Sequence, residues 1–286
     1  MKVGQWAALF CLVFLLSAMS LRSLDESQGR FTRILRRLES HATGRRLIDR
    51  ARQTWKARSL GELTQHLRWG SASRTDSTLV RNYNPRTGEE QKERRVVIVL
   101  REDQSDAALV LDLAHELTHA LARPAFDPYD PHLTVGSYLS LSIEGEGGEV
   151  AAMMSECSLS LEMNEKGEGP RFRRCKKYLD FSQNQLSRAR LLRDFYLSGR
   201  WYAEIKKELG VEAAQFPYLS ELEPQFYSSI VGFPYPHALI QEYKELTEAA
   251  CRNSLERKER SAQDNSNLSP LQAEFLKTRC QAFRSE

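Results

Sequence analysis

Proline and glycine are scarce in this sequence, with 10 and 15 residues among 286. This scarcity excludes collagen-like and low-complexity proteins, which need far more of both. Hydrophobic residues make up 41% and charged residues 28%, as is typical of a soluble globular protein. The net charge of +3 is too small to indicate nucleic-acid binding, so no nucleic acid is expected as a partner.

Cysteine is also rare, and none of the five cysteines has CxxC spacing. The missing spacing argues against a cysteine zinc site and against a thioredoxin motif. Four cysteines lie beyond the N-terminal apolar run, and they allow three pairings in an exported chain. The sequence-local choice joins Cys157 to Cys175 and Cys251 to Cys280. The alternative is that some of them are buried thiols.

Only one long apolar run occurs, from Trp6 to Met19. It follows Lys2 and ends at the small residues of Ala18-Met19-Ser20, which predicts a signal peptide over residues 1–20 and hence export. The run is shorter than the roughly 20 residues of a membrane-spanning helix. An uncleaved N-terminal anchor is the alternative.

Basic residues are concentrated on the C-terminal side of this apolar run. Residues 22–60 hold eleven Lys and Arg against four Asp and Glu, a local charge of +7, which leaves residues 61–286 mildly acidic. One interpretation is a solvated helix face. The other is a basic arm that docks onto an anionic membrane or envelope surface.

Hydrophobic periodicity predicts a mostly helical chain with one hairpin. Strands are expected over 78–83 and 95–100, because β-branched residues flank the turn residues 84–88. Helices are expected over 31–58 with a break at Gly44, and over 60–67, 105–123, 137–164, 185–209, 235–257 and 270–283.

The residues that carry chemistry are His115-Glu116-Leu117-Thr118-His119. Positions i and i+4 share one face of a helix, so both imidazoles can reach a single metal ion. Glu116 lies about 100° round the helix, where it can deprotonate a metal-bound water. The alternative without a function is a pair of surface histidines beside an ordinary glutamate. A catalytic Zn²⁺ is the predicted cofactor.

A third zinc ligand must come from elsewhere. Residues 120–126 lack the H-x-x-G-x-x-H continuation of three-histidine sites, so a downstream glutamate is the better candidate. Glu144 ranks first, because it is the only ionisable residue on a face of small residues. Glu149 ranks second and Glu146 third, since they share a face with Glu156 as on a solvated surface. If 145–148 is a loop, the assignment stays open.

The HELTHAL segment followed by Ile143-Glu144-Gly145-Glu146-Gly147 resembles the gluzincin class of zinc metallopeptidases, in particular bacterial exported members. The resemblance covers about 95–165. It implies a periplasmic or secreted enzyme, with association to a membrane as a further option. It also makes Glu144 the ligand glutamate. One departure is Gly148, which stands where thermolysin-like members carry an acid that supports a histidine, so Asp112 or Glu149 would have to serve.

Gluzincins also tend to have a downstream Tyr or His that stabilises the oxyanion. The segment Gly232–His237 resembles an F-P-Y segment of similar exported proteins, which makes Tyr235 the first candidate and His237 the second. The alternative is that Tyr235 only packs at a helix start. By the same resemblance, the strand over 95–100 would pair with an extended substrate at the cleft.

The sequence therefore predicts an α+β, predominantly helical chain with a zincin-like core, in which a small hairpin packs on the HExxH helix. We expect a signal peptide over 1–20, a basic helical segment over 21–70, the core over 71–165 and a helical part over 166–286 that completes the site. The expected activity is zinc-dependent hydrolysis of peptide bonds in a peptide or protein substrate. The rivals are a non-peptidase or inactive zinc protein, and a surface-binding protein that uses its basic N-terminal helices.

Overall fold

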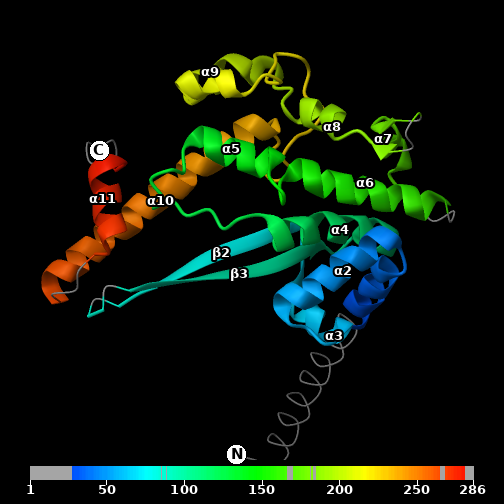
Figure 1. Cartoon of the computed structure of the whole chain (residues 1–286), viewed down its shortest axis with the longest axis horizontal. Helices are drawn as coiled ribbons and strands as arrows, with labels where there is room; N and C mark the ends of the chain where they lie inside the picture. The colour runs from blue at the N-terminus through cyan, green and yellow to red at the C-terminus, as the bar shows by residue number, and fades with distance from the viewer. Residues whose placement is uncertain are drawn as a thin grey trace, which may run out of the picture.

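The computed structural model describes residues 28–84, 86–87, 89–165, 170–180, 182, 185–264 and 268–280. The predicted signal peptide lies outside the described residues. Helices dominate and a small sheet of three strands accompanies them, which agrees with the predicted helix-rich α+β class (Figure 1).

The N-terminal helices break at a different place from the expected one. A helix over 28–39 is followed by α2 (Ala42–Trp55), so the break falls at residues 40–41 and not at Gly44. Gly44 lies inside α2, where an added Cβ would be 1.9 Å from the carbonyl oxygen of Leu38. The glycine therefore permits close approach between the two helices. A short helical stretch follows, with α3 (Leu60–Leu63) and the 3₁₀ turn η1 (Thr64–His66).

The predicted hairpin is present and longer than expected. It consists of β2 (Arg74–Tyr83) and β3 (Glu90–Arg101), antiparallel from Arg74 opposite Val99 to Tyr83 opposite Glu90. A short strand that the sequence pattern did not indicate, β1 (Leu67–Gly70), runs parallel to β3. The order β1-β3-β2 makes β3 the central strand and β2 an edge strand.

The helix expected over 105–123 is confirmed as α4 (Asp106–Ala122), whose first turn is capped by Ser105. The helix expected over 137–164 is divided into α5 (Val135–Glu144) and α6 (Glu149–Glu165). Three of the four residues in the intervening turn are glycines, which are unfavourable within a helix by about 1 kcal/mol each.

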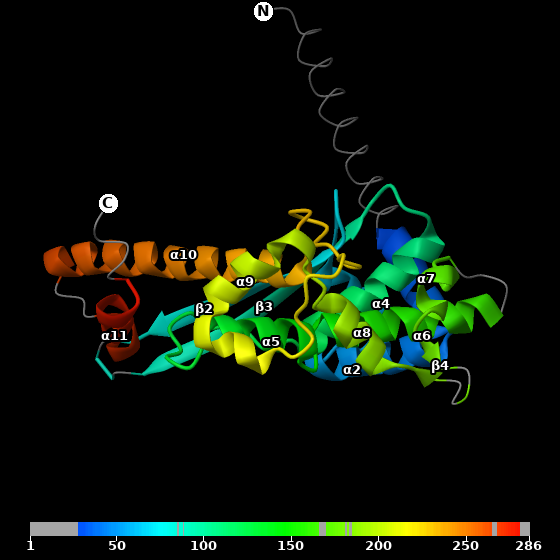
Figure 2. The ribbon, with the colours of Figure 1, turned by 90° about the horizontal axis from the view of Figure 1, so that it is seen from above.

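The remaining elements cover α5 and α6 on the side away from the hairpin, or extend beside it (Figures 1 and 2). The segment expected to be helical over 185–209 is in fact interrupted. In order, the elements are α7 (Phe172–Lys176), β4 (Leu179–Asp180), β5 (Gln185–Leu186), α8 (Arg188–Phe195), η2 (Gly199–Trp201), α9 (Tyr202–Leu209), η3 (Gly210–Gln215), α10 (Tyr235–Asp264) and α11 (Pro270–Thr278).

Two disulfides fasten this outer part, and they are the predicted pairs. Cys157 in α6 bonds to Cys175 in α7, and Cys251 in α10 bonds to Cys280 after α11. Disulfides of this kind fit an extracellular or periplasmic protein. In the part of the chain that the structure describes, every helix is too short or too polar to cross a bilayer.

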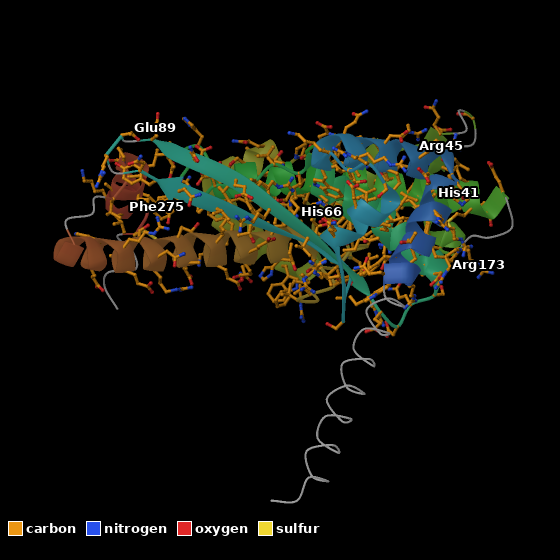
Figure 3. All side chains as sticks on the ribbon, turned by 90° about the horizontal axis from the view of Figure 1, so that it is seen from below. His41, Arg45, His66, Glu89, Arg173 and Phe275 are labelled. Carbon is orange, nitrogen blue, oxygen red and sulfur yellow. A yellow bond between two sulfur atoms is a disulfide. The ribbon has the colours of Figure 1, made fainter. Side chains whose placement is uncertain are left out.

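The basic N-terminal helices belong to the same hydrophobic core as α4. Their apolar face, which includes Phe31, Ile34 and Ile48, is buried with Leu109 and Leu113 of α4. Their polar face forms several ion pairs, among them Arg30 and Arg33 with Asp106, and Arg50 with Glu146. Figure 3 shows His41 and Arg45 at the end of the molecule opposite to Glu89 and Phe275.

Replacing Gly44 with Ala should lower the free energy of unfolding by about 1–3 kcal/mol, because the new methyl group would overlap the Leu38 carbonyl. Gly61→Ala is the matched control, since its nearest neighbour would be the Ser59 hydroxyl at 3.7 Å. Urea denaturation of both variants measures the difference. Equal stabilities would show that the helices can separate at no cost.

Candidate metal site

The α4 helix is buried around nearly its whole circumference, which places its polar residues inside the protein. The sheet, the N-terminal helices and α6 all pack against it. His119 is 5% exposed and Glu116 is 7% exposed. Neither side chain therefore lies on a solvated helix face, as the alternative of surface histidines beside an ordinary glutamate required. The HExxH residues therefore form an interior polar cluster.

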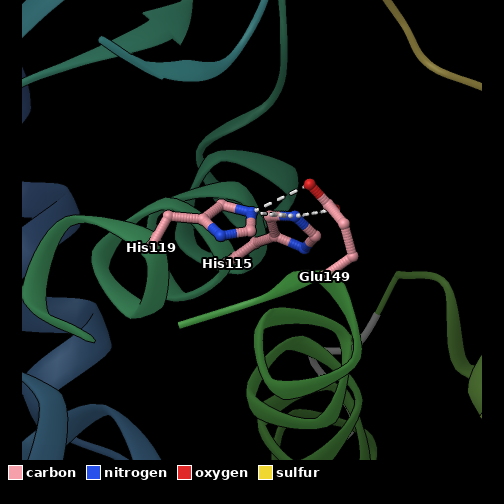
Figure 4. A group of neighbouring side chains, drawn as sticks. All are labelled: His115, His119 and Glu149. Carbon is pink, nitrogen blue, oxygen red and sulfur yellow. Dashed lines mark hydrogen bonds and ion pairs between the residues drawn. The ribbon is translucent and has the colours of Figure 1, made fainter. Parts of the chain in front are cut away.

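His115, His119 and Glu149 come together at this cluster, with one ligand atom from each lying within 4.8 Å of the others (Figure 4). The two Nε2 atoms are 3.1 Å apart. The Glu149 carboxylate oxygens lie 3.5 Å from each Nε2. Glu149 is the first residue of α6, so the group joins two helices.

The Nδ1 atom of each imidazole is fixed by a partner that can only accept a hydrogen bond. His119 Nδ1 donates to the Gly147 carbonyl at 2.8 Å, and His115 Nδ1 donates to Glu156 Oε2 at 3.1 Å. With the proton on Nδ1, a neutral imidazole exposes a lone pair on Nε2. The two Nε2 lone pairs and the carboxylate thus face one another.

Such a convergence of lone pairs could hold a metal cation. Glu149 Oε2 is buried and has no hydrogen-bond donor within the described part of the chain, which leaves it available as a ligand. Two imidazole nitrogens and one carboxylate oxygen are a donor set that suits zinc, with further positions open for water or substrate. The residues present therefore fit a metal ion.

The glutamate in this group is Glu149, the second-ranked candidate, and not Glu144. Glu144 ends α5, and its carboxylate accepts a hydrogen bond of 2.6 Å from Tyr196. Glu146 is exposed and pairs with Arg50. Glu149 takes this place because the turn at 145–148 changes the direction of the chain. As a result, α6 begins at Glu149, whose side chain faces the histidines of α4.

This turn lies against the end of α4 because residue 147 has no side chain. A Cβ on Gly147 would be 1.9 Å from the backbone nitrogen of Arg123. The close approach puts the Gly147 carbonyl at His119, so the glycine-rich turn both breaks the helix and orients one of the imidazoles.

A buried charge network supports His115, and the sequence pattern assigned its members differently. Glu156, expected on a solvated face, is 3% exposed and bonds to His115. Arg171 lies 3.0 Å from Glu156 and 2.7 Å from Asp112. Arg171 therefore links Asp112 to Glu156, the partner of His115. Burial raises the pKa of Glu156, but His115 and Arg171 outweigh it and lower that pKa to about 2.

Glu116 faces an open cleft of about 450 Å³ next to the metal site. The Thr75 hydroxyl of β2 lies 2.8 Å from Glu116 Oε2 and 2.9 Å from the Glu116 carbonyl oxygen, so its single proton can be donated to either acceptor. Burial is the main cause that raises the pKa of Glu116 above its usual value. A raised pKa suits a carboxylate that must take up a proton near neutral pH.

The cleft is lined by residues 73–79 along the edge strand β2, by the end of α4 and by α10, which runs beside the hairpin (Figure 2). The strand over 95–100, which we expected to pair with substrate, contributes none of the described residues that line this cleft. Within it, Ile98 and Val99 are paired on both sides, with β1 and with β2. The strand that lines the cleft is β2, an edge strand of the sheet. Exposed Ile230 and Val231 add an apolar rim.

Tyr235, the first oxyanion candidate, lines the same cleft at the start of α10. Burial and the nearby Glu149 carboxylate hold its pKa well above the usual value, so its phenol stays a hydrogen-bond donor. His237, the second candidate, is buried elsewhere: it packs on Trp201 and lies 3.2 Å from Glu204.

Replacing Glu149 with Gln should weaken Zn²⁺ binding by more than about 100-fold, since it removes a ligand, whereas loss of an outer partner costs about 10–100-fold. Glu144→Gln is the control and should bind zinc as the unmodified chain does. Competition with a chromophoric chelator measures both affinities. The reverse result would assign the site to Glu144.

Replacing Glu156 with Gln should lower zinc affinity about 10- to 100-fold, because His115 would lose its charged acceptor. Glu146→Gln serves as the control, since it lies nearby in sequence but is exposed. The same chelator titration applies. An unchanged affinity in Glu156→Gln would show that the network only stabilises the fold.

Comparisons with known proteins leave this site to be interpreted from its own residues. No family model, no curated protein and no solved structure matches the chain. What the structure itself provides is a group of two imidazoles and one carboxylate that could hold a metal ion, beside a buried glutamate in an open cleft.

Proposed function

We propose that this protein is an exported zinc metallopeptidase of gluzincin type. The observation that carries the proposal is the convergence of His115, His119 and Glu149 beside Glu116, in a cleft that runs along an edge strand. A metal-binding group alone would fit a structural site. A buried carboxylate that faces the cleft next to that group is what hydrolysis requires.

His115, His119 and Glu149 would hold the zinc ion. When bound there, zinc supplies Lewis-acid polarisation of the scissile carbonyl and lowers the pKa of a water toward about 7. Glu116 accepts the proton of the attacking water and passes it to the leaving amine. The hydroxyl of Thr75 holds Glu116 Oε2 in place, so the carboxylate does not need to reorient.

The substrate would bind as an extended strand. The edge of β2 offers unpaired backbone groups along the cleft, and an extended peptide can pair with such an edge. Tyr235 also lines the cleft and would donate its phenol proton as a hydrogen bond to the oxygen that becomes negatively charged. Arranged this way, the zincin-like core consists of α4, α6 and the β2–β3 hairpin.

Export is proposed on two grounds. The apolar run over residues 6–19 has the features of a signal peptide. The two disulfides are stable in a periplasmic or extracellular environment. A cytosolic zinc peptidase would need neither feature.

Glu116→Gln should reduce peptide hydrolysis at least about 100-fold and leave zinc content unchanged, because general-base catalysis contributes about 10²–10⁴-fold. The experiment measures bound zinc by mass spectrometry and cleavage of a broad peptide library. Glu146→Gln provides the active control. Equal cleavage by Glu116→Gln and the unmodified chain would exclude this mechanism.

A zinc-loaded but unreactive chain would contradict the peptidase proposal in a different way. If neither the unmodified chain nor the control cleaves any peptide, while both bind zinc, the site belongs to a non-peptidase or inactive zinc protein.

A further inference from the structure

Two arginines in the cleft have no acidic partner. Arg94 of β3 donates to Ser77 Oγ at 3.0 Å and to the Ala120 carbonyl at 2.9 Å. Arg123, just after α4, donates to Ser142 Oγ at 2.9 Å. Among the residues that the structure describes, neither guanidinium has a carboxylate within ion-pair distance. Both side chains line the cleft.

Other charged residues line the same cleft, including Glu116 and Glu149 at the candidate metal site. Arg74, which also lines the cleft, pairs with Asp76 at 2.9 Å. The acids Glu242 and Glu245 of α10 line the cleft too, and Glu242 and Arg123 both lie near Tyr138. Arg94 and Arg123 are thus two cleft guanidinium groups without a carboxylate at ion-pair distance among the described residues.

The positive charges of the two guanidinium groups also repel each other. Burial and the positive charge of Arg123 both lower the pKa of Arg94. Arg123 in addition carries an Nε atom that is buried without a hydrogen-bond acceptor in the described part of the chain. An anion between the two side chains would relieve the repulsion and accept the unused N–H groups.

The pair lies next to the metal site. Arg94 Nη2 is 3.4 Å from the carbonyl oxygen of His119, the residue that supplies the second imidazole. An extended peptide advances about 3.3 Å per residue. A group bound by the arginines would therefore belong to a residue close to the scissile bond.

We propose that Arg94 and Arg123 form a subsite that binds a carboxylate of the peptide substrate. The inference rests on the proposed peptidase function and adds a preference to it. Guanidinium groups match a carboxylate in shape and can bind it through two parallel hydrogen bonds. The carboxylate can come from an Asp or Glu side chain or from the C-terminus of a peptide, and the experiment distinguishes the two.

The test uses matched peptides with the zinc-loaded full chain. One pair carries Glu or Gln next to the cleavage site, and another ends in a free carboxylate or an amide. Cleavage rates are compared for the unmodified chain. Binding of the same peptides is measured by fluorescence anisotropy in the Glu116→Gln background, where they stay intact.

We expect a preference of about 10- to 100-fold for the acidic member of at least one pair, the range for hydrogen bonds to charged groups. Arg123→Gln should abolish that preference, and Arg123→Lys should restore part of it. Arg74→Gln, which removes a cleft arginine that already has a partner, should retain it. Loss of preference in the Glu/Gln pair identifies a side chain as the source, and loss in the acid/amide pair identifies the C-terminus.

Equal binding and cleavage within both pairs would overturn the inference while leaving the peptidase proposal intact. So would a preference that survives both Arg123→Gln and Arg94→Gln. Failure to cleave any peptide would instead contradict the peptidase proposal. Arg94 also caps the carbonyls at the end of α4, so Arg123 is the more informative position if Arg94→Gln unfolds.

Discussion

The arrangement of the site depends on how the Nδ1 atoms of two histidines are held. A carboxylate and a backbone carbonyl, both acceptors only, fix His115 and His119 in one tautomer. Both acceptors come from the segment that begins with the glycine-rich turn and continues into α6. The same segment supplies Glu149, so the ligands and the groups that orient them are positioned by one helix pair.

Holding so many polar groups inside the protein requires that they satisfy one another. Glu156, Asp112 and Arg171 form an ion-paired group away from solvent, which offsets part of the desolvation that burial of each charge would cost alone. The hydroxyl of Thr75 does the same for Glu116. Among the described residues, Glu149 Oε2 is a buried carboxylate oxygen without a hydrogen-bond donor, and it belongs to the group that could hold a metal ion.

Local sequence was sufficient for the features that depend on spacing alone. The i, i+4 histidines, the buried character of α4, the hairpin and both disulfides could all be predicted in this way. The third ligand could not, because its identity depends on whether residues 145–148 continue the helix. Glu149 and Glu156 are seven residues apart and share a face of α6, but an acidic face looks solvated until the helix that covers it is known. The sequence also did not show that β3 is the central strand of the sheet and β2 an edge strand, because β1 is too short to recognise from its pattern.

The disulfide between Cys157 and Cys175 has a meaning beyond cross-linking. It fastens the segment that begins with Arg171 onto α6, one residue after Glu156. The cross-link therefore holds Arg171 near Glu156, whose carboxylate accepts the hydrogen bond from His115 Nδ1. Without this cross-link, the ion pairs of Arg171 with Glu156 and Asp112 would remain as its side-chain contacts with the network behind His115.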